Sequence, residues 1–324
     1  MLKAVLYSKE NQSSGFIRGN KCVFYQQVLS SPAKKCKYQL NAAKRSMTKE
    51  IRIGRVSVGG NNPPAILGVV NISPESFYTD SFTPCDKVLS RVEQMSYEGA
   101  DIIDIGARST ALNSEPISVS EEKARVLSAL ADLDGCGAVL SLDTCHAEVL
   151  SAALHYDISL INDISGLSSP EYAKTAADSG LPVIAMAAHR IPGDPTNITS
   201  THTALREILS RADAAGISDV ILDPGIGKWV AERDSAADWE LCRRFSELKE
   251  YNCPLLAAVS RKLFIGECID KAPQERLFGS LAVLYHLMEA GANLLRVHDV
   301  SATRDFVRIF SHLNNGKYEL FLSL

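Results

Sequence analysis

Short apolar runs recur along the chain from residue 50 onward, separated by stretches in which apolar positions have helical spacing. Each run is almost continuously apolar, which is typical of strands that are covered on both faces in a parallel sheet. The runs predict eight strands, at 66–70, 102–105, 139–142, 159–162, 182–186, 219–222, 254–259 and 293–297. The intervening stretches predict helices at 86–99, 120–132, 146–156, 170–179, 201–215, 235–250 and 274–290.

Eight strands that alternate with helices predict an α/β fold, a (β/α)8 TIM barrel with an eight-stranded parallel sheet. The preceding segment 51–58, IRIGRVSV, alternates apolar and polar residues and predicts an N-terminal β-hairpin that plugs the bottom of the barrel. The alternative is a doubly wound open sheet, which is expected to carry a glycine-rich dinucleotide loop after its first strand. The sequence NISPESF at 71–77 is not such a loop, so the barrel is favoured.

The charge divides the chain into two parts. Residues 1–46 hold nine Lys/Arg and one acid, whereas the remainder holds 25 Lys/Arg against 37 Asp/Glu. A domain that acidic is a poor match for a phosphate backbone, so no nucleic-acid partner is expected. Residues 1–46 are interpreted as a basic leader, disordered or not native, with a transit peptide as the alternative. The barrel domain is expected to span 47–324.

Two further features concern the cell compartment. No apolar run approaches the roughly 20 residues that cross a bilayer, so no membrane partner is expected. The eight cysteines are scattered and lack the spacing of a zinc site or a disulfide framework. Reduced thiols are typical of intracellular proteins, so a cytoplasmic location is predicted.

Polar residues follow the ends of almost all predicted strands. In a barrel of this class the carboxyl ends of the strands build the active site. Any single Asp or Asn there is more often a turn or cap residue, but seven of the eight strands end in this way. The residues are Asn71, Asp104, Asp143, Asn162, Asp223, Ser260, Arg261, Lys262, Arg296 and His298, and the fifth strand ends in Met186, which predicts an apolar wall.

These residue types predict two kinds of contact. Asp143, Asn162, Asp223 and Lys262 can hydrogen-bond the edge of a flat heterocycle that carries an amino group, ring nitrogens and a carbonyl. Asn71, Arg296 and His298 offer an amide, a guanidinium and an imidazole, which suit a diphosphate with a magnesium ion.

Seven collinear motifs resemble one known family. They are ILGVVNISPESF, GADIIDIGARST, SLDT, INDISG, ILDPGIG, VSRKLFIG and RVHDV, and they cover essentially all of 64–300. Their order and spacing are similar to those of dihydropteroate synthase, and an archaeal-type member is one form that the resemblance allows. The resemblance implies a transferase of folate biosynthesis that joins 6-hydroxymethyl-7,8-dihydropterin diphosphate to para-aminobenzoate, with Mg²⁺ as cofactor, small molecules as partners and a homodimeric assembly.

The resemblance also implies a role for each matching position. Asn71, Lys262, Arg296 and His298 would be catalytic, and Asn71 would bind the metal. The pterin would contact Asp104, Asp143, Asn162, Met186, Asp223 and Lys262. The diphosphate would contact Asn71, Thr110, Arg296 and His298, and the acceptor would contact Ser260 and Lys228.

Two loops depart from the family pattern. Arg108 occupies the place of a family glutamate, and Ala111 stands where an arginine is usual. Lys228 replaces a phenylalanine of the acceptor pocket, which indicates a more anionic acceptor, unless Lys228 is solvated and Trp229 packs instead. Alternatives therefore stay open: a synthase with a phosphorylated arylamine acceptor, a methyltetrahydrofolate–corrinoid methyltransferase, or a non-catalytic pterin-binding protein.

Overall fold

The computed structural model describes residues 48–73, 82–108 and 116–314. Its main sheet has eight strands, and every neighbouring pair is parallel. The strands are β3 (Ala65–Asn71), β4 (Ile102–Gly106), β5 (Leu140–Asp143), β6 (Ile158–Asp163), β7 (Val183–Met186), β8 (Val220–Asp223), β9 (Leu256–Ala257) and β10 (Leu294–Val297).

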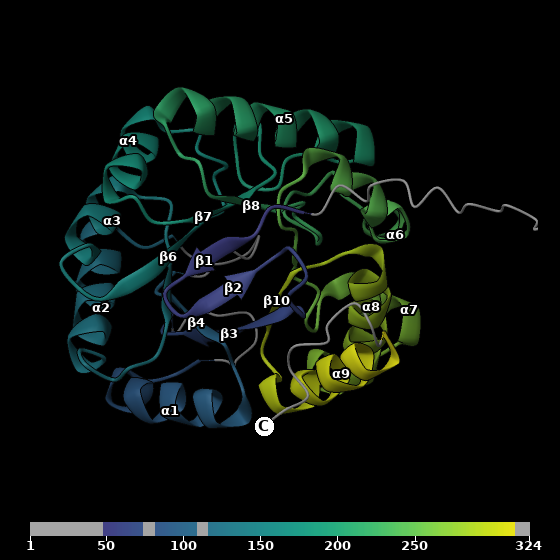
Figure 1. Ribbon diagram of the computed structural model, residues 1–324, viewed down its shortest axis with the longest axis horizontal. Helices are drawn as coiled ribbons and strands as arrows, with labels where there is room; N and C mark the ends of the chain where they lie inside the picture. Colours follow the sequence, from purple (N-terminus) through teal and green to yellow (C-terminus); the bar gives the residue numbers. More distant parts are fainter. Residues whose placement is uncertain (1–47, 74–81, 109–115, 315–324) are drawn as a thin grey trace, which may run out of the picture. The chain divides into compact units, whose positions relative to one another are not determined.

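The sheet closes into a barrel. Its order is β8-β7-β6-β5-β4-β3-β10-β9, and a parallel bridge between Leu222 and Leu255 joins the two ends. The backbone N–H of Leu222 donates to the carbonyl of Pro254 at 2.9 Å across this seam. Figure 1 shows the helices arranged around the strands. The predicted (β/α)8 barrel is therefore confirmed.

The helices largely follow the predicted ranges. They are α1 (Val88–Glu98), α2 (Val119–Asp132), α3 (Ala147–Ala153), α4 (Pro170–Ser179), α5 (Ile198–Ala215), α6 (Ser235–Arg244), α7 (Leu263–Ile269), α8 (Leu277–Ala290) and α9 (Val300–Leu313). The chain continues after α6 as a 3-10 helix, Phe245–Tyr251. No helix among the described residues has the length and apolar content needed to cross a membrane.

Two helices and one strand differ from the prediction. α7 has seven residues, too few to display a helical period, and α9 was not predicted although its buried residues Val300, Thr303, Val307 and Phe310 are three or four positions apart. The predicted strand 254–259 is reduced to Leu256–Ala257. The adjoining Pro254 has no N–H to donate to a ladder.

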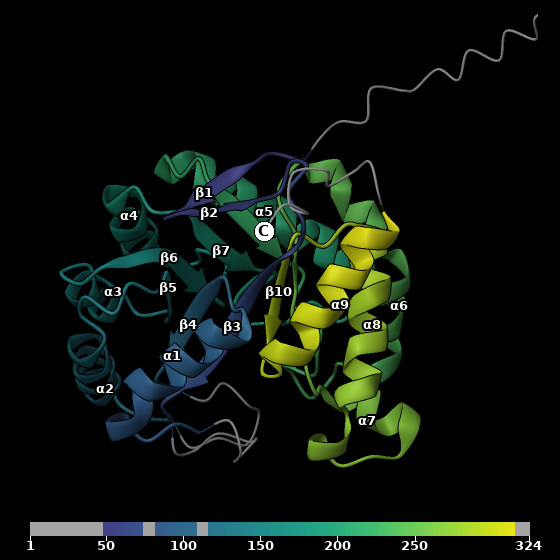
Figure 2. The same ribbon diagram turned by 60° about the horizontal axis from the view of Figure 1, so that its bottom comes forward.

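The predicted plug is present. β1 (Ile51–Ile53) and β2 (Val56–Val58) form an antiparallel hairpin. Ile51, Ile53 and Val58 are buried in one cluster with inward residues near the strand starts, such as Ile102 and Leu294. Figure 2 shows the hairpin at one end of the barrel and α7 at the other. The hairpin thus closes the amino end and leaves the carboxyl end for the site.

Candidate active site

One guanidinium connects three strands at the carboxyl end. Arg296 of β10 donates from Nε to Oδ2 of Asp104 and from a terminal nitrogen to Oδ2 of Asp143, both at 2.8 Å. Asn162 of β6 donates its amide N–H to the same Asp104 oxygen at 2.9 Å. Oδ1 of Asp104 is buried without a hydrogen-bond partner among the described residues. A buried, unsatisfied acceptor of this kind is suited to a ligand N–H.

Burial determines the charges of this group. Desolvation raises the pKa of Asp143 to about 7, although the Arg296 charge opposes the shift and Asp104 adds to it. Burial disfavours the charge on Arg296, but Asp104 and Asp143 outweigh it and raise the pKa of Arg296 above its ordinary value. Arg296 is therefore a permanent cation that is paired with Asp104 and Asp143. Asp143 itself can gain or lose a proton near neutral pH.

A second polar group lies at the end of β8. Asp223 is buried and accepts the backbone N–H of Gly225 at 2.8 Å. Desolvation raises its pKa, and Lys262 opposes that shift. The Lys262 ammonium donates to the carbonyl of Ile226, and burial lowers its pKa to about 8, with Asp223 opposing. Met186 is fully buried, and a Cβ on Gly225 would lie 3.3 Å from its Cγ, so Met186 forms an apolar boundary beside these groups.

His298 lies beside Ser260. Its Nδ1 is 3.0 Å from the Ser260 hydroxyl oxygen, which also accepts the His298 backbone N–H at 3.3 Å. Burial lowers the pKa of His298 to about 4, and the Arg296 charge adds to this. The sequence motif RVHD predicted that Arg296 and His298 act together as cation-capable groups at an anion site. At neutral pH His298 is uncharged, because it is desolvated beside a permanent cation.

A clamp that the sequence prediction missed joins the SRK and RVHD motifs. Arg261 donates to both carboxylate oxygens of Asp299, at 2.9 and 2.6 Å, and to the carbonyls of Pro273 and Gln274. Arg261 adopts a left-handed backbone, with φ of 58°. The clamp places Lys262 and Ser260 next to the end of β10. The motif spacing identified both segments but not this pairing, and Asp299 was not singled out.

Asn71, the predicted metal ligand, ends β3. Its side-chain oxygen accepts the backbone N–H of Ser73 at 3.0 Å. Across residues 48–73, 82–108 and 116–314, no three His, Cys, Asp or Glu side chains gather as a set that could hold a metal ion. Mg²⁺ usually takes one or two protein ligands and several oxygens from phosphates and water. A single amide oxygen at the strand end fits that mode of binding, with the substrate supplying further oxygens.

The acceptor and loop positions differ in their surroundings. Lys228 is exposed, whereas Trp229 is half-buried. The Arg108 guanidinium donates to the Cys145 sulfur at 3.3 Å, and burial raises the pKa of that thiol to about 11, so the thiol is neutral. Thr110, predicted to contact the diphosphate, and Ala111 lie outside the described residues.

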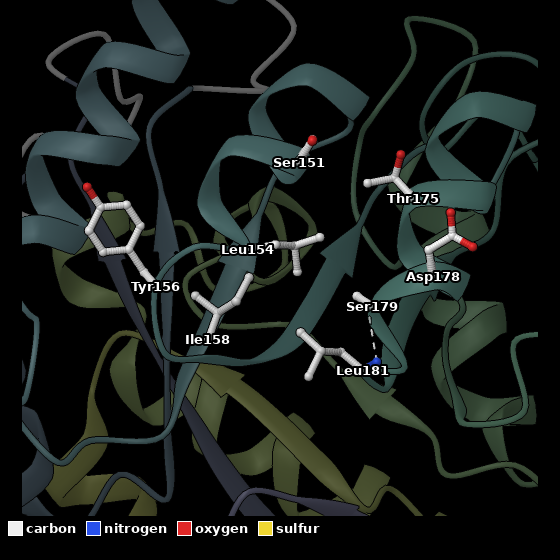
Figure 3. Close-up of a pocket in the computed structure, with 8 residues that line it drawn as sticks. All are labelled: Ser151, Leu154, Tyr156, Ile158, Thr175, Asp178, Ser179 and Leu181. Atoms are coloured by element: carbon white, nitrogen blue, oxygen red, sulfur yellow. Dashed lines mark hydrogen bonds between the residues drawn. The ribbon is translucent and has the colours of Figure 1, made fainter.

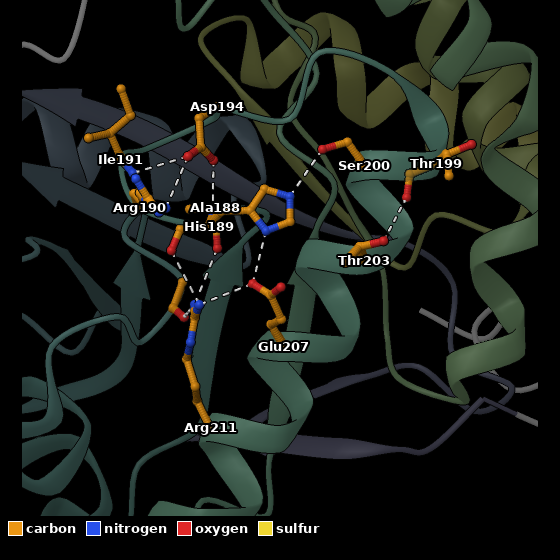
Figure 4. A network of polar contacts seen from close by, with 11 residues as sticks. Ala188, His189, Arg190, Ile191, Asp194, Thr199, Ser200, Thr203, Glu207 and Arg211 are labelled. Carbon is orange, nitrogen blue, oxygen red and sulfur yellow. Dashed lines mark hydrogen bonds and ion pairs between the residues drawn. The ribbon is translucent and has the colours of Figure 1, made fainter.

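The loop between β7 and α5 forms part of the rim at this end of the barrel (Figure 4). The Asp194 carboxylate accepts the backbone N–H of His189 at 2.7 Å, and Arg211 of α5 donates to the carbonyls of Gly166 and Ala188 at 2.9 and 3.2 Å. The Arg211 side chain of α5 and the loop's own Asp194 thereby hold the backbone of this loop. The loop can support residues of the site that pack against it.

The chain also has a hollow that is remote from these groups (Figure 3). It lies where α3 and α4 end, at the start of β6, and its lining includes Leu154, Tyr156, Ile158, Ser179 and Leu181. This is the amino end of the strands. The predicted polar groups that the structure describes lie at the opposite end, so the hollow is not part of the candidate site.

Comparison with known proteins gives the family. A sequence profile described as pterin binding enzyme matches residues 67–298. The dihydropteroate synthase of Haemophilus influenzae is 33% identical over 270 residues, which cover 78% of this chain and 95% of that protein. The Bacillus subtilis dihydropteroate synthase is 34% identical over 259 residues, covering 78% and 89% of the two chains.

A solved structure agrees with the sequence relatives. The dihydropteroate synthase of Xanthomonas albilineans, determined with 4-aminobenzoic acid, superposes with a TM-score of 0.73 at 30% identity and covers 83% of this chain and 99% of that chain. The profile match begins within the first of the seven motifs, ILGVV, and ends within the last, RVHD. This chain therefore belongs to the dihydropteroate synthase family of pterin-binding enzymes.

Proposed function

We propose that this chain is a dihydropteroate synthase. It would condense 6-hydroxymethyl-7,8-dihydropterin diphosphate with para-aminobenzoate, releasing diphosphate and forming 7,8-dihydropteroate for folate biosynthesis. The relatives at 33% and 34% identity have that name, and the alignments cover 95% and 89% of their lengths.

The observation that carries this proposal is the polar array that surrounds Arg296. The free Oδ1 of Asp104 and the carboxylate of Asp223 can accept N–H groups from a heterocycle. Asn162 and Lys262 can donate to a carbonyl or a ring nitrogen. Acceptors and donors that converge on one concave site, with an apolar wall at Met186, match the edge and the face of a pterin.

The reaction requires a good leaving group more than a strong nucleophile. Arg296 would stabilise negative charge as it develops on the departing diphosphate, because it is a permanent and partly buried cation. His298 would donate a hydrogen bond rather than a charge, since it is neutral near pH 7. The arylamine needs placement against the pterin methylene carbon and no base of its own.

Magnesium is part of this proposal. Asn71 would hold the ion together with diphosphate oxygens, and a bound Mg²⁺ would neutralise charge on the leaving group. The residues of the chain would still bind the pterin, exclude water and orient the acceptor.

The test is product detection with the purified full chain. With the pterin diphosphate, Mg²⁺ and para-aminobenzoate, mass spectrometry is expected to find dihydropteroate and diphosphate in equal amounts. Tight pterin diphosphate binding without product from any arylamine would contradict the proposal and support a non-catalytic pterin-binding protein. A methyltransferase is less favoured, since the relatives and the solved structure reported above are dihydropteroate synthases.

One observation favours a second acceptor class. Arg108 contacts a neutral thiol, and Lys228 is exposed at the position of a family phenylalanine. Both cations could bind the phosphate of a phosphorylated arylamine. Turnover with that acceptor and with para-aminobenzoate distinguishes the two, and exclusive use of para-aminobenzoate would refute the second class.

A homodimer and a cytoplasmic location complete the proposal. Ile269 of α7 and Phe278 and Ala282 of α8 are exposed apolar residues, hereafter the α7–α8 patch, and Phe278 is 82% exposed. A second copy of the chain could cover such a surface. Within the described part of the chain, the cysteines at positions 136, 145, 242, 253 and 268 are free thiols, as is usual in a reducing compartment.

A further inference from the structure

Trp229 packs into the carboxyl end of the barrel against a glycine. A Cβ on Gly193, in the loop between β7 and α5, would lie 2.2 Å from Cγ of Trp229. No side chain larger than hydrogen fits at position 193 while the indole is in this place. Gly193 also has a φ of 66°, which favours glycine. The indole of Trp229 therefore packs directly against the backbone of the loop between β7 and α5.

Hydrogen bonds near the contact between Trp229 and Gly193 join the loops after β7 and β8. Arg233 and Asp238 form a buried pair, and the Asp238 carboxylate also accepts the backbone N–H of Gly227 at 2.8 Å. Arg233 donates to the carbonyl of Pro195 at 2.7 Å. These bonds hold the backbone at both sides of the indole, so the position of Trp229 is set by two loops rather than one.

The Lys262 ammonium lies over the ring of Trp229. Its ammonium nitrogen is 5.1 Å from the centre of the Trp229 ring and donates to the carbonyl of Ile226. A Cβ on Gly227 would lie 2.9 Å from Cδ of Lys262. The lysine side chain is therefore confined by a glycine, a carbonyl and an aromatic face, all from the segment 226–229.

The surroundings of Lys262 both oppose and favour its positive charge, so the contact with the Trp229 ring matters for that charge. Burial disfavours the ammonium, Arg296 and Arg233 repel it, and Asp223 and Asp238 attract it. His298 is also close, but it is neutral. The indole nitrogen of Trp229 is buried and has no hydrogen-bond partner within the described part of the chain. Lys262 and Trp229 are both partly buried, and partial desolvation strengthens the attraction between a cation and an aromatic ring.

We propose that Trp229 is a positioning residue for Lys262, whose indole holds the ammonium charged and directed toward the bound pterin donor. The inference rests on the proposed function for the identity of that ligand. In the altered motif after LDPG, Lys228 is exposed and the aromatic ring stands one position later, at Trp229.

The first test follows Lys262 itself in the ligand-free protein. Its titration can be recorded by NMR of the lysine side chain in the wild type, Trp229→Phe and Trp229→Leu. Loss of the ring is expected to lower the pKa of Lys262 by about one unit, because a cation–π contact favours the charged form of the lysine. Phenylalanine keeps a ring and breaks no hydrogen bond of the indole, so W229F is expected to stay close to wild type.

The second test follows donor binding by calorimetry. Trp229→Leu is expected to weaken pterin diphosphate binding about tenfold at pH 8.5 and less at pH 6.5. In a Lys262→Met background the same substitution is expected to have no such pH dependence. The matched control is Trp239→Leu, which removes the other tryptophan, packed at 4.8 Å against Phe264, and is expected to leave the Lys262 titration unchanged.

Three results would overturn the proposal: an unaltered Lys262 titration in W229L, equal shifts in W229F and W229L, or the same shift in W239L. The titration needs neither ligand nor turnover. A failure of the positioning role is therefore distinguishable from a failure of the proposed function, which would instead show as absent donor binding or absent product. Should W229L not fold, Trp229→Met and W229F provide the same contrast between a side chain without a ring and one with it.

Discussion

Arg296 connects β10 to β4 and β5 through ion pairs with Asp104 and Asp143. Removing one partner of such a buried group leaves the other charge unpaired, which costs more than the bond itself. At the residue scale, the site is therefore a set of coupled groups. Substitutions in it are expected to change both ligand binding and pH dependence.

Lys262→Ala is expected to weaken pterin diphosphate binding about 10- to 100-fold. The ammonium is a partly buried cation that can donate a charge-assisted hydrogen bond, worth roughly 1.5–3 kcal/mol. Calorimetry measures the change, with Lys174→Ala as control because the Lys174 side chain is 79% exposed on α4. Unchanged affinity in the Lys262 variant would remove this residue from the pterin site.

Asp143→Asn is expected to abolish one pH-dependent part of the stability of the ligand-free protein. The folded-state pKa of Asp143 is about 7, above the ordinary 3.8, so the folded chain binds more protons than the unfolded chain between these values. This contribution to the free energy of unfolding is complete below about pH 4 and is lost as the pH rises to about 7. Urea unfolding of both proteins from pH 4 to 8 tests it. A stability difference that does not vary across that range would contradict the prediction.

At the element scale, the turn after β9 is held from outside the site. The Arg261–Asp299 clamp ties the segment before α7 to the start of α9, so the two motifs that carry Lys262 and His298 move together. Neither α7 nor α9 contributes a side chain to the polar array itself. Their role is to hold the backbone that does.

Asp299→Ala is expected to lower the free energy of unfolding by about 2–4 kcal/mol, because it leaves the buried Arg261 guanidinium without its carboxylate. Chemical denaturation measures the loss. The matched control is Glu275→Ala, which breaks the exposed pair with Lys271, where both side chains are about half exposed, and is expected to cost less than about 1 kcal/mol. Equal losses in the two variants would show that the clamp is no stronger than a surface ion pair.

The strands were predictable at this scale because they are buried on both faces. Val70, Ile105 and Leu142 belong to runs with little polar interruption, and such runs are visible without knowing their neighbours. The length of β9 was overestimated because an apolar run indicates that residues are buried, not that they pair in a sheet. Leu255 and Val259 are buried beyond the two residues that form the strand.

At the scale of the whole molecule, the hairpin closes one end of the barrel and the candidate site lies at the other. The closed end is apolar, with Ile53 and Leu294 in one cluster. Outside the barrel, the α7–α8 patch is exposed beside the elements that support Lys262. A second copy of the chain on that patch would stabilise the back of the site.

Phe278→Glu is expected to convert a homodimer into a monomer. Burying a new carboxylate in an apolar contact costs far more than exposing it in a monomer. Light scattering after gel filtration measures the mass, expected near twice the chain mass of 35.2 kDa for the wild type. The control is Tyr97→Glu, since Tyr97 is 93% exposed on α1 and lies outside the patch. A monomeric wild type would contradict the homodimer.

The sequence by itself determined the barrel, the plug, the family and the strand ends that carry the site. Those features are local, since a buried run, a turn residue or a motif can be identified from neighbouring letters. The tertiary structure decided how the polar residues combine. It assigned Arg296 to Asp104 and Asp143, made His298 neutral, turned Trp229 inward beneath Lys262 and left Lys228 in solvent. These outcomes depend on the stagger between strands and on desolvation, which arise only when distant segments are packed together.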